Sequence, residues 1–153
     1  MKIKKELSSY RNIVSMILEK EQEKEEIADS KADVSGPSYD VTGSRPTGYI
    51  QTNKENKIYE CDRKIDLLNR EIKKLKRTLN VLDSLILTLD AEEKLIIVGF
   101  FLEGKTNRKI CKELDAFRGI TQENEQSTIE AIKKRKGRII KKMQKRYDNR
   151  TKN

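Results

Sequence analysis

The chain has 153 residues, of which 39% are charged and 35% hydrophobic, and its net charge is +9. This length allows one or two small domains, and so polar a composition suits long amphipathic helices better than the core of a large enzyme. No histidine is present and the only cysteines are Cys61 and Cys111, which excludes a Cys/His zinc finger and a four-thiolate metal site. We therefore expect no metal, no cofactor and no enzymatic activity.

The N-terminal segment begins with charged residues and has no apolar run behind it. We expect neither a signal peptide nor a membrane span, and a cytoplasmic protein in which both thiols are free. An N-terminal helix is predicted within residues 1–29, because its apolar side chains recur at steps of three and four. These side chains are Ile3, Leu7, Tyr10, Val14 and Ile17.

Residues 30–52 contain both prolines and three glycines, with Ser, Asp and Thr between them. This composition predicts a flexible loop. Its length is unusual for a connector, so the loop is either mobile or functional.

A long coiled-coil helix is predicted at residues 53–89. Its apolar positions, again at steps of three and four, are Ile58, Cys61, Ile65, Leu68, Ile72, Leu75, Leu79, Leu82, Ile86 and Leu89. Isoleucine predominates at the first position of each heptad and leucine at the second, which favours a two-stranded parallel coil. We therefore expect a homodimer whose seam contains Ile58, Ile65, Leu68, Ile72, Leu75, Leu79 and Leu82.

The same apolar face could instead pack against the N-terminal helix of its own chain as an antiparallel hairpin. The two arrangements are compatible if Leu67, Val81 and Leu85 widen the apolar surface of the long helix.

Three helices are predicted within residues 90–147, followed by a disordered tail at 148–153. Asp90 is placed to cap the first helix with Glu93 reaching back to it, and Gly104 is placed to end that helix. Thr106 is placed to cap the second helix, and the third begins near residue 127 or 128. The expected inward positions are Ile110, Cys111 and Leu114 in the second helix, and Ile129, Ile132, Ile139, Ile140, Met143 and Tyr147 in the third.

Positive charge is concentrated at the third of these helices. Residues 133–152 contain eleven Lys and Arg and one acidic residue, so the rest of the chain is close to neutral. Two short helices followed by a basic helix are typical of a helix-turn-helix, whose last helix enters the major groove of double-stranded DNA. The candidates for base contacts are Ser127, Glu130, Lys133 and Lys134, and those for phosphate contacts are Thr106, Asn107, Arg135, Arg138, Lys141 and Lys142.

Residues 102–114, followed by Ser127, Thr128 and Ile129, resemble the helix-turn-helix of sigma-factor region four and related regulators. The layout of the whole chain, with Glu6-Leu7 and Tyr10-Arg11 in its first helix, is similar to that of phage late-transcription activators of the RinA and ArpU kind. This resemblance implies an all-α transcriptional regulator encoded in a prophage, with DNA and RNA polymerase as partners.

The connection between the two short helices departs from that family. Twelve residues, 115–126, separate Leu114 from Ser127, where the family has about four. Either the turn is longer, or the third helix begins at Thr121 with an acidic first turn.

Two other functions fit the same features. A phage terminase small subunit also combines a helix-turn-helix with coiled-coil oligomerisation, and it binds DNA for packaging. A coiled-coil interaction protein that does not bind DNA would carry the basic end only as a solvated surface.

Overall fold

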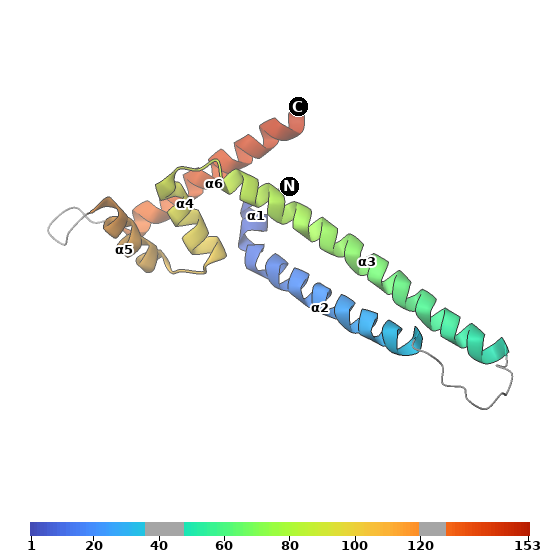
Figure 1. Cartoon of the computed structure of the whole chain (residues 1–153). Coiled ribbons are helices and arrows are strands. Elements are labelled where there is room, and N and C mark those ends of the chain that lie inside the picture. The colour runs from blue at the N-terminus through green and yellow to red at the C-terminus, as the bar shows by residue number, and fades with distance from the viewer. Residues whose placement is uncertain (36–47, 120–127) are drawn as a thin grey trace. The chain divides into compact units, whose positions relative to one another are not determined.

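The computed structural model describes residues 1–35, 48–119 and 128–153, and every regular element within these ranges is a helix (Figure 1). The predicted all-α class is confirmed. The helices are α1 (Ile3–Ser8), α2 (Tyr10–Ser35), α3 (Gly48–Ile86), α4 (Ala91–Ile97), the π-helical η1 (Val98–Leu102), α5 (Asn107–Arg118) and α6 (Ile129–Lys152). They form two compact units, one containing residues 1–13 and 77–153 and the other residues 14–76.

Several predicted boundaries were wrong. The loop predicted at 30–52 is helical at both ends, because α2 continues to Ser35 and α3 begins at Gly48, and its middle lies outside the described residues. The long helix ends at Ile86 rather than at residue 89. The tail predicted to be disordered is helical as far as Lys152.

The first unit is built on a core to which α1 and every later element of the unit contribute. Its buried side chains are Ile3, Leu7, Leu82, Leu85, Ile86, Leu89, Ile96, Ile97, Ile110, Cys111, Leu114, Ile132, Ile139 and Met143. The backbone N–H of Ile3 also donates to Oε1 of Gln144 in α6, at 2.8 Å. The N-terminus is therefore part of the C-terminal helical domain, which the sequence did not predict.

A break at Ser9 separates α1 from α2. The backbone N–H of Ser9 donates to the carbonyls of both Lys5 and Glu6, at 3.1 Å each. After this break Ile13 is buried, whereas Val14 is 37% exposed. The prediction that Val14 faces inward was wrong, and Ile13 takes its place in the apolar stripe.

The predicted helix caps are confirmed. The Asp90 carboxylate accepts from the backbone N–H of Glu93 at 2.8 Å, and the Glu93 carboxylate accepts from the backbone N–H of Asp90 at 3.4 Å. Thr106 and Thr128 cap α5 and α6 through their side-chain oxygens. Because α6 begins after Thr128, the alternative that it starts at Thr121 is wrong. Gly104 has the expected left-handed backbone, with φ at +67°.

Three helices of the first unit are joined through one carboxylate, that of Glu92 in α4. Nε and Nη2 of Arg118 in α5 donate to it at 2.8 Å each, and Nη2 of Arg135 in α6 lies 2.7 Å from it. The hydrogen bonds from Arg118 and then from Arg135 lower the pKa of Glu92 to about 2. Glu92 therefore fixes the position of α6 against α4 and α5.

In the second unit, α2 and α3 pair as an antiparallel hairpin (Figure 1). Three ion pairs mark the pairing, because residues later in α2 meet residues earlier in α3. They are Lys20 with Glu71, Glu21 with Lys76 and Lys31 with Asp62. The structure therefore contains the intrachain hairpin that the sequence allowed as an alternative.

This pairing places part of the predicted oligomerisation seam inside the chain. Leu68 and Ile72 are buried in the second unit, and Leu82 is fully buried in the core of the first. Their prediction as dimer contacts was wrong, since one chain already covers them. The other seam positions, Ile58, Ile65, Leu75 and Leu79, are half-buried.

We predict that Leu68→Ala lowers the free energy of unfolding by about 2 kcal/mol, because it removes buried methyl groups from the hairpin. Leu67→Ala is the matched control, since Leu67 is 49% exposed while Leu68 is 7% exposed. Urea unfolding followed by circular dichroism measures both variants. Equal losses would contradict the assigned orientation of α3.

We also predict that Glu92→Gln lowers the free energy of unfolding by about 1–2 kcal/mol at neutral pH, because two guanidinium groups lose their carboxylate. The pKa of Glu92 is lowered from 4.5 to about 2, so its contribution is complete above pH 4.5 and is lost as the pH falls toward 2. The stability gap between wild type and variant should therefore narrow over that interval in urea unfolding. Glu130→Gln, at an exposed position of α6, should show no such difference in stability from wild type. If the stability difference between wild type and Glu92→Gln does not change with pH, the pairing of Glu92 with the two arginines is contradicted.

Candidate nucleic-acid interface

The two faces of α6 have opposite character. Ile132, Ile139 and Met143 are buried against the rest of the first unit. Four cations recur at steps of three and four on the opposite, exposed face, which we call the cationic face. They are Lys134, Arg138, Lys141 and Lys145. Within the part of the chain that the structure describes, none of the four has an acidic partner.

The cations at the edge of the buried face are held by acidic groups of α4. Arg135 is bound to Glu92. Nζ of Lys142 donates to both carboxylate oxygens of Glu93, at 2.8 and 3.2 Å, and Glu93 is only 7% exposed. Both cations were predicted to bind phosphate, and the structure gives each a role in holding α6 against α4. Glu92 and Glu93 therefore have structural roles.

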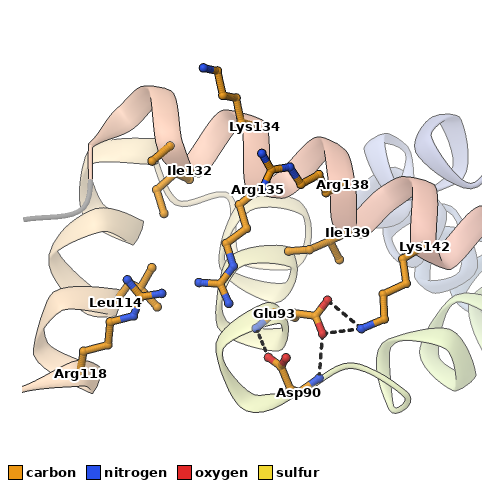
Figure 2. A pocket seen from close by; sticks show the side chains of 11 residues that line it. Asp90, Glu93, Leu114, Arg118, Ile132, Lys134, Arg135, Arg138, Ile139 and Lys142 are labelled. Atoms are coloured by element: carbon orange, nitrogen blue, oxygen red, sulfur yellow. Dashed lines mark hydrogen bonds and ion pairs between the residues drawn. The ribbon is translucent and has the colours of Figure 1, made fainter.

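A cleft of about 580 Å³ opens between α4, α5 and α6 (Figure 2). Leu114, Ile132 and Ile139 form its apolar lining, and charged side chains from all three helices complete it. Figure 2 shows Lys142 reaching across to Glu93. Lys134 and Arg138 of the cationic face also line the cleft. Its other cations, Arg118, Arg135 and Lys142, are paired with Glu92 or Glu93.

The N-terminus of α5 is the second place where phosphate contacts were predicted. The Thr106 side-chain oxygen accepts from the backbone N–H of Lys109 at 3.3 Å. Oδ1 of Asn107 accepts from Nζ of Lys136 at 3.4 Å, and this Nζ also lies 3.2 Å from the centre of the Phe100 ring. Burial, followed by the charges of Lys133 and Lys4, lowers the pKa of Lys136.

These contacts engage both polar side chains predicted to bind phosphate at α5. Thr106 remains exposed. Together with three basic residues of α5, it lines a recess in the surface. They are Arg108, Lys109 and Lys112. Sequence analysis did not select these three residues, although their spacing at steps of one and three places them beside the helix N-terminus.

The predicted base contacts fall on the first turns of α6. Glu130, Lys133 and Lys134 are exposed there, and the Glu130 and Lys133 side chains lie 3.9 Å apart. Ser127 lies outside the described residues. Of the predicted phosphate contacts, Arg138 and Lys141 belong to the cationic face. Lys145 was missed, although its four-residue step from Lys141 could have identified it.

No group of His, Cys, Asp or Glu side chains in the described residues could hold a metal ion. None of the described helices is both long enough and apolar enough to cross a membrane. Both cysteines are free thiols, with Cys111 buried, and burial raises the pKa of Cys111.

Comparison of the chain with models of known protein families, with curated proteins and with solved structures gave no match. The arrangement of charges on α6 is therefore the basis on which a function is proposed.

Proposed function

We propose that this protein is a sequence-specific regulator that binds double-stranded DNA and inserts α6 into the major groove, with α5 and α6 acting as a helix-turn-helix. The observation that carries this proposal is the cationic face of α6, which lies opposite a buried stripe and has no acidic partner among the described residues. A major groove about 12 Å wide admits one α-helix.

The dimensions of α6 suit such a contact. The helix has 24 residues, and its cationic face runs from Lys134 to Lys145, about 16 Å along the axis. Phosphates border the major groove on both sides, so a helix with exposed cations along its length can neutralise several of them and release their counterions. A surface of this kind gives affinity for any duplex, and contacts to base edges add the preference for one sequence.

The base contacts that we propose are Lys133, Lys134 and Glu130 near the start of α6, together with Ser127. Lysine donates to the O6 and N7 acceptors of guanine, and glutamate accepts from the amino group of cytosine. Arg138 and Lys141 are the proposed phosphate contacts on α6, and Thr106 is the one proposed at α5. Arg135, Lys142 and Asn107 would first have to leave their partners within the protein.

We further propose that the regulator acts on transcription, as the resemblance to phage late-transcription activators implies. In that role it would function in the cytoplasm with RNA polymerase as a partner, and without catalysing a reaction. The cationic face favours this proposal over a protein that uses its helices only for protein contacts, because such a protein has no need of unpaired cations along one helix face.

A homodimer belongs to the same proposal, because two linked copies of α6 would bind two half-sites. Support comes from the half-buried seam positions of α3, Ile58, Ile65, Leu75 and Leu79, and from Leu67, which is 49% exposed. Burying these side chains against a second hairpin would remove apolar surface from water. The proposed dimer is therefore a bundle of two hairpins rather than a two-stranded coil.

We predict that replacing Arg138 and Lys141 together by Ala weakens DNA binding about tenfold at low salt. The slope of log affinity against log salt concentration should fall by about 2, one for each lost phosphate contact. The matched control replaces the exposed Lys57 and Lys73 of α3 by Ala, which removes the same charge from the other unit. Fluorescence anisotropy over a salt series measures both.

The probes are a duplex selected by the wild-type protein from a random-sequence library and a duplex of unrelated sequence. Equal effects of the two double variants would contradict a specific role for the cationic face. If the wild-type protein forms no complex with any duplex at low salt, the proposed function is wrong.

We predict that the wild-type protein sediments as a dimer at micromolar concentration, and that Ile58→Asp combined with Ile65→Asp makes it monomeric. Each substitution would bury an unpaired carboxylate at the proposed interface. Circular dichroism should show that helicity is retained, because both side chains are only half-buried in the single chain. Asn56→Asp, at an exposed position of the same helix, is the control, and a monomeric wild type would contradict the dimer.

A further inference from the structure

Gly137 occupies the middle of α6 at a position where the fold does not require glycine. Its backbone does not have the left-handed conformation found at Gly104 and Gly119. A Cβ atom placed on Gly137 would have no neighbour within 4 Å among the described residues, whereas one placed on the buried Gly99 would lie 3.5 Å from Ile110. In the part of the chain that the structure describes, neither a turn nor a close packing contact explains the absence of a side chain here.

Glycine is nevertheless unfavourable at such a position. In the interior of a helix it loses more conformational freedom on folding than alanine does, and it exposes the helix backbone to water. Alanine at 137 would fit the described structure without displacing any atom. The chain therefore has a less stable helix than it could have, and the benefit must lie outside its own fold.

The surroundings of Gly137 indicate what approaches it. Lys133 and Lys134 lie one turn before it and Lys141 lies one turn after it, and all three side chains are exposed. Because Gly137 has no side chain, it leaves the helix backbone uncovered between the cations one turn before it and the cation one turn after it. This pattern suits an anionic surface that must approach the backbone of α6 more closely than a side chain at position 137 would permit.

We infer that Gly137 is the point at which α6 comes closest to the DNA duplex. This inference rests on the function proposed above and locates the contact more narrowly. The middle of α6 would enter the groove most deeply, with Lys134 and Lys141 on either side of the closest approach. Base contacts would then centre on Lys133 and Lys134, which lie one turn before Gly137. Glycine is commonly used where a backbone must approach a ligand closely.

Two substitutions test the inference, and neither changes the charge. Gly137→Ala and Gly137→Gln should each raise the melting temperature by about 2–4 °C, because both residues favour the helix more than glycine does. The affinity for a duplex selected by the wild-type protein should fall about threefold for Ala and at least tenfold for Gln. The salt dependence should stay unchanged, because the phosphate-binding cations are all retained.

The control is Asn149→Gln, which lengthens an exposed side chain of the same helix more than three turns from Gly137. It should leave the affinity unchanged. If Gly137→Gln binds the selected duplex as tightly as the wild type does, the inference is wrong and DNA binding by α6 stands. If Gly137→Ala lowers the melting temperature, glycine has a role in the fold and the inference is also overturned. If the wild type binds no duplex at low salt, the inference and the proposed function are both wrong.

Discussion

The packing of α6 through Ile132, Ile139 and Met143 is the constraint that determines the charged surface of the first unit. These three side chains are almost fully buried, so the rotation of α6 about its own axis is fixed. Fixing that rotation determines which basic residues face the protein and which face solvent. Without it, residues 133–152 would be a charged segment with no defined surface.

This rotation divides the basic residues of α6 into two groups with different chemistry. Arg135 binds Glu92, Lys142 binds Glu93, and Arg146 donates to the carbonyl of Thr88 at 2.8 Å. All three cations hold the helix in place, and the charges of Arg135 and Lys142 are compensated by the carboxylates that they bind. The cationic face, by contrast, keeps its charge exposed, and fields from exposed cations attract a polyanion over about a Debye length. Net charge alone does not separate these two groups.

Local signals predicted much of the fold. The caps at Asp90 and Thr106 were correct because each depends on hydrogen bonds within one turn of the chain. The contribution of α1 to the C-terminal core was not predictable in this way, since Ile3 and Gln144 are brought together only by tertiary structure. The exposure of Val14 was not predictable either, because Ile13 and Val14 both fit an apolar spacing of three and four residues.

The sequence predicted that a basic helix forms the candidate site, but it did not predict which basic residues of that helix are bound within the protein. A basic helix following two short ones was evident, and Arg138 and Lys141 are on its exposed face. The sequence could not show that Arg135 is bound to a carboxylate, because Glu92 lies more than forty positions away. It also gave no reason to select Gly137, since glycine is informative only when the space around it is known. A residue type that stabilises neither the helix nor the core points to a surface selected for contact with another molecule.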